Sequence, residues 1–262
     1  MIITPKLHFS SVLMISLVTV TLIWAIPYFL GPNIATISSD LTYIPLTTVL
    51  TITALFQVSQ TYKKNKENLI WIIFAIFAIF YNIAQHIWSV NELILDQKPF
   101  PSIADIAFLI DTICLVVFFI FYIKSLKQNV SKKMWVMAIL PSGGIILFSM
   151  YSYTISNTAE NIINQILLFS YPFLDSIALV PSLIGIMLWF KNKMNFAVFL
   201  ICSSMIPLTV GDILFQITTQ NGITYSGSIP DLFYYNQIVL LIFGVYYLAN
   251  IITKNNFEVK KI

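Results

Sequence analysis

Long apolar runs separated by short polar segments recur along the whole sequence. Each run is about 20 residues long, which is the length that a helix needs to cross roughly 30 Å of hydrocarbon at 1.5 Å per residue. The pattern therefore predicts a bundle of about eight transmembrane helices. We place them near residues 11–30, 42–62, 69–90, 105–124, 134–154, 165–190, 195–217 and 232–252.

The segments between the predicted helices are too short for a soluble domain, so we expect residues 1–262 to form a single transmembrane domain. Composition points the same way, because 58% of the residues are hydrophobic and only 10% are charged, whereas a soluble domain carries about 25% charged residues. Such a chain cannot cover a water-facing surface, and its expected surroundings are membrane lipid. The fold class that follows is an all-α integral membrane protein.

The lysines gather in alternate connections between the predicted helices. One side of the bundle carries Lys6, Lys63, Lys64, Lys66, Lys124, Lys127, Lys132, Lys133, Lys191, Lys193, Lys254, Lys260 and Lys261. The opposite connections carry Lys98 and the acids Asp40, Glu92, Asp96, Asp105, Glu160 and Asp231. Because lysines stay on the cytoplasmic side, we predict a multi-pass protein of the cell membrane with both termini in the cytoplasm. The net charge of +3 does not indicate nucleic-acid binding, since there is no basic stripe with interleaved aromatic residues.

The first predicted helix has a second interpretation, because a basic residue followed by an apolar core also begins a secretory signal peptide. The segment has no small-x-small cleavage site, however. Pro27, followed by Gly31 and Pro32, is typical of the end of a helix. We therefore favour a first helix that stays in the protein.

Two helix starts resemble each other. Ser102-Ile103-Ala104-Asp105 opens the fourth predicted helix, and Ser228-Ile229-Pro230-Asp231 opens the eighth. Ser-x-x-Asp before an apolar run is typical of a capping box, in which both side chains bind free amides at the start of the helix, and we favour this role. The alternative is a parallel 4+4 repeat, because four spans separate the two segments.

Three predicted spans carry polar side chains at the spacing of one helical face. The third has Asn82, Gln85, His86 and Ser89, the sixth has Tyr171 and Asp175, and the seventh has Thr209, Asp212 and Gln216. Asp105 and Asp111 add two acids near the start of the fourth. Ionisable groups inside a membrane protein are functional candidates when they face the interior of the bundle. If the faces converge, they line a polar pocket that opens to the extracellular side and suits a cation, a proton or a small polar ligand.

The alternative is that these side chains only hold helices together. Hydrogen bonds between spans contribute about 0.6 kcal/mol on average, and a protonated aspartic acid can serve as a packing element. We favour this structural role for Asn82, Gln85, Thr209 and Gln216, and for Asp111 because it lies near a helix start. For Asp175 and Asp212 the two interpretations stay equal.

Catalytic motifs are absent from the sequence: it has no G-x-S-x-G, H-E-x-x-H, C-x-x-C or P-loop pattern. The two histidines, His8 and His86, lie on opposite predicted sides, so they cannot share a metal within one chain. Cys114 and Cys202 lie inside apolar runs without metal-ligand spacing. We expect no catalytic residue, no metal and no cofactor.

Four short motifs support a resemblance: residues 101–109 (PSIADIAFL), 171–175 (YPFLD), 211–215 (GDILF) and 225–228 (YSGS). Their order over residues 70–250 resembles a bacterial group of multi-span sensor regions, in which such a membrane part precedes diguanylate cyclase, phosphodiesterase or histidine kinase domains. The resemblance implies that Asp105, Asp175 and Asp212 occupy the family's motif positions. The chain departs from the pattern at residues 111–114, where a second Tyr-Pro is missing, and no output domain follows.

Three functions remain open. The resemblance and the polar faces favour a freestanding sensory or accessory membrane module that signals through a separate protein partner. The intramembrane acids, the prolines Pro172 and Pro181 and the repeat favour a small transporter or proton-coupled carrier. An intramembrane enzyme acting on a lipid ranks last, because catalytic groups are few.

Overall fold

The computed structural model describes residues 5–62, 65–126, 128–155 and 162–259, and within these segments the chain is helical with no β-strand. The helices are α1 (Pro5–Leu30), α2 (Pro32–Thr61), α3 (Asn65–Leu93), α4 (Ile103–Ser125), α5 (Lys132–Ile155), α6 (Ile162–Phe190), α7 (Phe196–Ser203), α8 (Met205–Gln220) and α9 (Ile229–Val259). Eight stretches are long and apolar enough to cross a membrane, with α7 and α8 together forming one of them. The prediction of an all-helical fold with eight such helices is confirmed.

The break between α7 and α8 falls at Ser204. Pro207 follows three residues later and has no amide hydrogen to donate to the carbonyl of Ser203. Ser182 of α6 donates a hydrogen bond to the carbonyl oxygen of Cys202, close to the break. By contrast, α6 runs without interruption through Pro172 and Pro181.

The largest difference from the predicted spans lies at the start of α2, which begins ten residues earlier than expected, at Pro32. Gly31, with a φ of 113°, is the whole connection to α1, and Pro32 begins the new helix. α1 itself passes through Pro27, which therefore does not end it. Asp40, expected in a connection, lies inside α2 and is fully buried.

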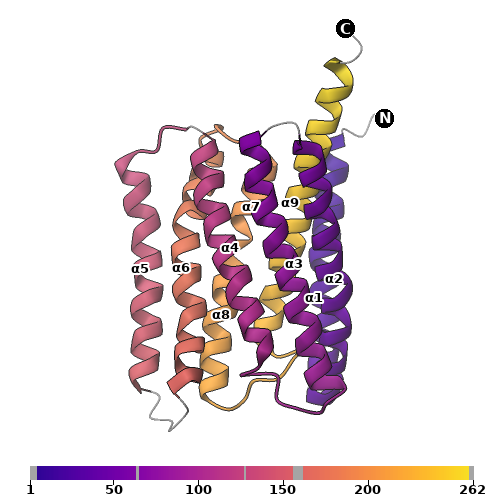
Figure 1. The fold of residues 1–262 in the computed structure, drawn as a ribbon, viewed down its shortest axis with the longest axis vertical. Helices are drawn as coiled ribbons and strands as arrows, with labels where there is room; N and C mark the ends of the chain where they lie inside the picture. Colours follow the sequence, from indigo (N-terminus) through magenta and orange to yellow (C-terminus); the bar gives the residue numbers. More distant parts are fainter. Residues whose placement is uncertain (1–4, 63–64, 127, 156–161, 260–262) are drawn as a thin grey trace.

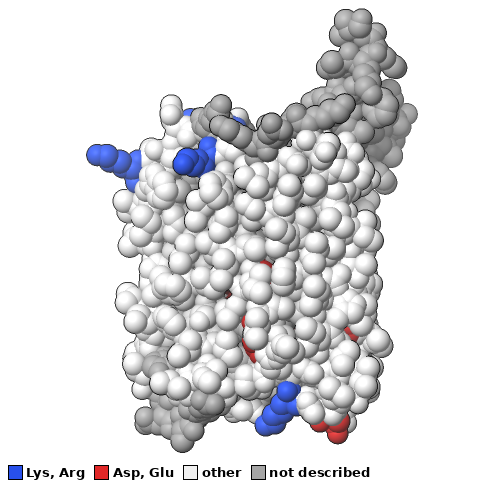
Figure 2. All heavy atoms as spheres, viewed as in Figure 1, with Lys and Arg blue, Asp and Glu red and all other residues white. Residues whose placement is uncertain are grey.

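Consecutive spans run in opposite directions, so the connections alternate between the two ends of the bundle, and α1 begins at the same end at which α9 finishes (Figure 1). We call this the lysine end, because Lys124, Lys132, Lys133, Lys191 and Lys193 lie there. Figure 2 shows blue side chains at this end, both charge signs at the opposite end, and a flank between them that is almost entirely uncharged. Lys63, Lys64, Lys127, Glu160, Lys260 and Lys261 lie outside the described residues.

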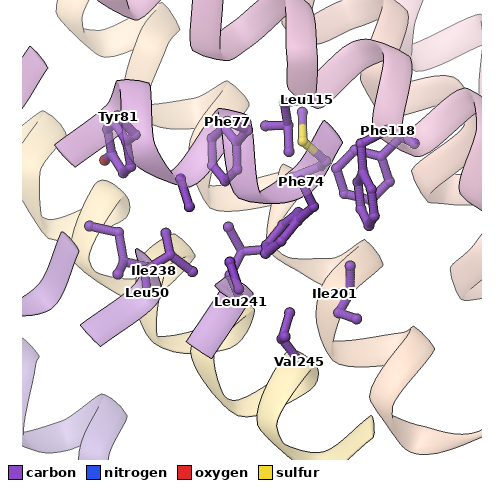
Figure 3. Close-up of a cluster of buried hydrophobic side chains, with 14 of the residues drawn as sticks. Leu50, Phe74, Phe77, Tyr81, Leu115, Phe118, Ile201, Ile238, Leu241 and Val245 are labelled. Atoms are coloured by element: carbon purple, nitrogen blue, oxygen red, sulfur yellow. The ribbon is translucent and has the colours of Figure 1, made fainter. Parts of the chain in front are cut away.

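The core of the bundle is apolar and rich in aromatic rings. It brings together α2, α3, α4, α7 and α9 through side chains such as Leu50, Phe74, Phe118, Ile201 and Leu241 (Figure 3). Most of these side chains are inaccessible to solvent. Helix α5 lies at the edge of the bundle against α6 (Figure 1).

Two consecutive glycines, such as Gly143 and Gly144 of α5, often mark a place where helices pack closely. Here a β-carbon added to either residue would have no atom of another helix within 4 Å. Close packing instead occurs at Gly185 and Gly244. Added β-carbons there would lie 2.4 Å from the sulfur of Cys202 and 2.6 Å from the side chain of Ile201. The two glycines allow α6 and α9 to approach α7.

Candidate functional site

A partly enclosed cavity lies between α3, α4, α6, α8 and α9, in the half of the bundle opposite the lysine end. Its volume is about 90 Å³, measured as the space that the centres of water molecules can occupy. One buried water needs roughly 10–15 Å³, so several waters or one small ligand fit. Its lining includes four aspartates, Asp105, Asp111, Asp212 and Asp231, together with rings such as Tyr43, Tyr81, Trp88, Phe108, Tyr171, Phe215 and Tyr234.

The apolar core closes the cavity toward the lysine end. Phe77 and Leu115 belong both to the core and to the cavity lining, and Phe74 and Phe118 pack beyond them (Figure 3). At the other end, lining residues come from the connection between α8 and α9, residues 221–228. The cavity is therefore associated with one end of the bundle only.

Asp105 joins α4 to α6. Its Oδ2 accepts a hydrogen bond from the amide of Ser102 at 2.6 Å, and the hydroxyl of Ser102 accepts one from the amide of Ala104. The predicted capping box at this helix start is confirmed. The second oxygen, Oδ1, accepts a hydrogen bond of 2.7 Å from the hydroxyl of Tyr171, so the acid that begins α4 also fixes a phenol on the cavity wall.

Asp231 joins α9 to α2 in a similar way. Its Oδ1 accepts a 2.7 Å hydrogen bond from the hydroxyl of Tyr43, and its Oδ2 accepts one from Ser39. The amide that it binds is that of Gly227, not that of Ser228. The arrangement therefore differs from the predicted capping box. The carboxylate of Asp231, on α9, links the connection between α8 and α9 to helix α2.

Gly227 is required at this place. Its φ is 86°, a conformation that other residues rarely adopt, and an added β-carbon would lie 2.5 Å from the carbonyl oxygen of Ala35 in α2. The neighbouring Ser226 donates to Glu92 and accepts a 2.8 Å hydrogen bond from the indole of Trp88. The connection is thus bonded to α3 as well as to α2.

Asp212 and Asp175 lie side by side at the contact between α8 and α6. Asp212 Oδ1 accepts a 2.7 Å hydrogen bond from Tyr234 of α9. Asp175 is fully buried behind the lining and lies beside Asp212. Neither Asp175 oxygen has a hydrogen-bond donor in the part of the chain that the structure describes. Two buried carboxyl groups that lie side by side repel each other when both are ionised, and a proton held between them removes this repulsion.

Asp111 and Gln237 leave two acceptors unsatisfied on the cavity wall. Asp111 Oδ1 accepts a weak bond from Thr112, but Asp111 Oδ2 and Gln237 Oε1 have no hydrogen-bond partner among the described residues. The two side chains are 4% and 1% exposed. Buried polar atoms nearly always find a partner, so both atoms are open to a molecule in the cavity.

The structure brings together five of the ten sequence-predicted pocket residues. Gln85, Asp105, Asp111, Tyr171 and Asp212 line the cavity, and Asp175 supports it from behind. The other four, Asn82, His86, Thr209 and Gln216, lie outside its lining. Tyr43, Tyr234 and Gln237 were not among the predicted residues.

Asn82 and His86 line a separate shallow hollow on the outside of α3, where Asn82 donates to Thr48 and Thr51 of α2 at 3.4 Å. Gln216 bonds Ser149 of α5, and the hydroxyl of Thr209 donates to a carbonyl of its own helix. These four side chains have structural partners and do not face the central cavity.

The electrostatic character of the cavity is acidic. Its lining has four aspartates and no lysine or histidine. In the described part of the chain, no group of three His, Cys, Asp or Glu side chains is arranged to hold a metal ion. At the rim, burial raises the pKa of Tyr225, which keeps this phenol neutral. The arrangement can bind a cationic or hydrogen-bond-donating small molecule.

Comparisons of the chain with protein-family models, with curated proteins and with solved structures give no match.

Proposed function

We propose that the chain is a multi-pass protein of the cell membrane that works as a sensory or accessory module, with its lysine end in the cytoplasm. The eight apolar helices and the almost uncharged flank support membrane embedding. The bias of lysines to one end supports the orientation. In this orientation the cavity belongs to the extracellular half of the bundle.

The observation that carries the sensory role is a polar, partly enclosed cavity associated with one end and closed by packed aromatic residues toward the other. A site of this form can bind a ligand from one side of the membrane, and it offers no continuous path across. The resemblance to multi-span sensor regions agrees, since Asp105 and Asp212 of its motifs line the cavity and Asp175 lies behind them.

A module without catalytic groups of its own acts through another protein, and the lysine end is the surface at which we expect contact. Crosslinking in native membranes, followed by affinity purification and mass spectrometry, tests this. We expect a stoichiometric partner that is lost on Lys193→Glu. The matched control is Lys98→Glu, the same charge reversal on an exposed lysine at the opposite end. Recovery of a homo-oligomer with no partner contradicts the proposal.

Orientation can be tested separately. In a chain with Cys114 and Cys202 replaced by serine, we expect a membrane-impermeant maleimide to label Lys98→Cys in intact cells and to label Lys193→Cys only after permeabilisation. The reverse pattern contradicts the orientation. It leaves the partner experiment unaffected, because that experiment does not depend on which side is labelled.

A small transporter or carrier is the second candidate, favoured by a paired arrangement that fits a parallel 4+4 repeat. Asp105 of the fourth span binds Tyr171 of the sixth, and Asp231 of the eighth span binds Tyr43 of the second, each at 2.7 Å. In a 4+4 repeat the fourth span corresponds to the eighth and the sixth corresponds to the second. The two aspartate–tyrosine pairs therefore occupy equivalent positions in the two halves. Transporters of this kind bind substrates at the interface between their repeats.

More pairs on the cavity wall fit the same exchange. Asp111 lies six residues after Asp105, and Gln237 lies six residues after Asp231. Gln85 and Trp88 on α3 have the same spacing as Asp212 and Phe215 on α8, and all four line the cavity. A carrier must also open toward the lysine end, so flux of a bound compound across proteoliposomes distinguishes it from a sensor.

A further inference from the structure

The cavity wall has a charge and hydrogen-bonding pattern that selects among ligands. Asp111 Oδ2 and Gln237 Oε1 are both acceptors, both are more than nine-tenths buried, and neither has a donor among the described residues. Since both line the same cavity, a ligand that supplies N–H or O–H groups satisfies them. A ligand with only acceptors leaves them unpaired.

The charge of the cavity lining further restricts the class of ligand that the cavity can bind. Four aspartates line the cavity, whereas its lining has no lysine or histidine to offset them. An anion, or a zwitterion such as a free amino acid, brings a carboxylate into this surrounding and is disfavoured. A bare metal ion is also disfavoured, because the described acids are not clustered at metal-ligand distances.

The rest of the lining is aromatic, with rings from Phe77, Tyr81, Trp88, Phe108 and Phe215. Trp88 packs edge-to-face against Phe108 and Phe215 at ring-centroid distances of 6.0 and 6.2 Å, so these rings form a continuous wall. Aromatic faces attract ammonium groups and cover apolar carbon chains. The ligand therefore combines a positive head with an organic body.

We propose that the cavity binds a small primary ammonium compound, whose N–H groups donate to Asp111 Oδ2 and Gln237 Oε1 while its organic body packs against the aromatic wall. This inference names the ligand class of the proposed sensory cavity and rests on that proposed function. It differs from water filling, which satisfies the same oxygens but makes no use of the negative charge or of the rings.

The test uses the full chain purified in lipid nanodiscs at pH 7, with thermal unfolding and calorimetric titration as readouts. Butylamine and 2-phenylethylamine are the cationic probes, and butan-1-ol and 2-phenylethanol are their neutral counterparts of nearly the same shape. Choline is a cation without N–H donors. We expect at least one amine to raise the melting temperature and to bind at least tenfold more tightly than its alcohol and than choline.

Two variants locate the binding. Asp111→Asn keeps the shape and an acceptor oxygen but removes the charge, and we expect it to weaken the amine at least tenfold. Asp96→Asn is the matched control, because Asp96 is exposed in the connection between α3 and α4, outside the cavity lining. Its φ of 50° also suits asparagine. We expect it to bind the amine as the wild type does.

The amine-against-alcohol comparison on the wild type needs no variant, so the proposal stays testable if Asp111→Asn fails to fold. Three results overturn it: no amine binds, the alcohols or choline bind as well as the amines, or Asp111→Asn binds the amine unchanged. These results leave the partner experiment untouched. Conversely, if an amine binds but no partner copurifies, the accessory role is contradicted and the ligand site is supported.

Discussion

The ring of Tyr234 lies directly over the backbone of Gly211, and its hydroxyl bonds the next residue, Asp212. A β-carbon added to Gly211 would lie 2.5 Å from Cε1 of this ring. The hydroxyl donates to Asp212 Oδ1 at 2.7 Å. The absence of a side chain at Gly211 thus allows a phenol from α9 to reach an acid on α8, which gives a physical reason for the Gly-Asp pair at this place.

Gly211→Ala is expected to displace the Tyr234 ring and to lengthen its bond to Asp212. We expect a loss of about 1–3 kcal/mol, which is typical of overpacking, measured as a lower melting temperature in nanodiscs. Gly143→Ala is the control, since a β-carbon there meets nothing within 4 Å. It should be neutral or stabilise by up to about 1 kcal/mol through helix propensity. Equal effects of the two variants contradict the packing argument.

Tyr43→Phe removes the hydroxyl that donates to Asp231 Oδ1, and Tyr171→Phe removes the hydroxyl that donates to Asp105 Oδ1. A buried acceptor that loses its donor costs about 1–3 kcal/mol, so thermal unfolding should show two losses of similar size. Tyr151→Phe, on an exposed tyrosine of α5, should change little. A large loss from only one of the two buried variants argues against equivalent halves.

Gly227→Ala is expected to destabilise more than Gly222→Ala. Both glycines have positive φ, 86° and 67°, so alanine is strained at either position by about 1–2 kcal/mol. Only at Gly227 does the new carbon also clash, with the carbonyl of Ala35. The difference between the two melting temperatures isolates that contact. Proteolysis of the connection between α8 and α9 should rise in the Gly227 variant and remain low in the other.

Asp175→Asn is expected to keep the stability of the wild type to within about 1 kcal/mol, because an amide N–H can donate to Asp212 as a shared proton does. Asp175→Ala removes the contact and leaves a cavity, and it should cost several times more. Both can be compared by thermal unfolding at one pH. If the asparagine variant is as unstable as the alanine variant, a negative charge is required at residue 175.

The eight long apolar helices could be predicted because apolar length is a property of each segment alone. The start of α2 could not be, since the helical segment before residue 42 contains Ser39 and Asp40, which read as a connection. In the structure, these side chains have partners far away in the sequence: Asp231 for Ser39 and Ser89 for Asp40. Polar residues whose hydrogen-bond partners are distant in the sequence carry no local signal of burial.

The pocket was predictable only in part for a geometric reason. Successive residues of a helix point about 100° apart, so Gln85 and His86 share one broad polar face in the sequence but point to different surroundings in the structure. Gln85 lines the cavity, and His86 is exposed beside Asn82. The sequence does not single out Tyr43 and Tyr234, because an isolated tyrosine in an apolar run is ordinary, and only its partner acid gives it significance. Only Tyr234 lies in the span next to its partner acid, Asp212. Tyr43 and Asp231 are 188 residues apart, so no local signal links them.

Helix α9 begins at Ile229, carries Asp231 of the cavity lining in its first turn, and continues as one helix to Val259, beyond the other helices at the lysine end (Figure 1). At 1.5 Å per residue its 31 residues measure about 46 Å. In a helix of this length, a tilt of about 5° around the first turn moves the far end by about 4 Å. Under the proposed sensory function, a small rearrangement of the carboxylate at one end would displace the other end, where we expect a partner protein to dock, without any molecule crossing the bundle.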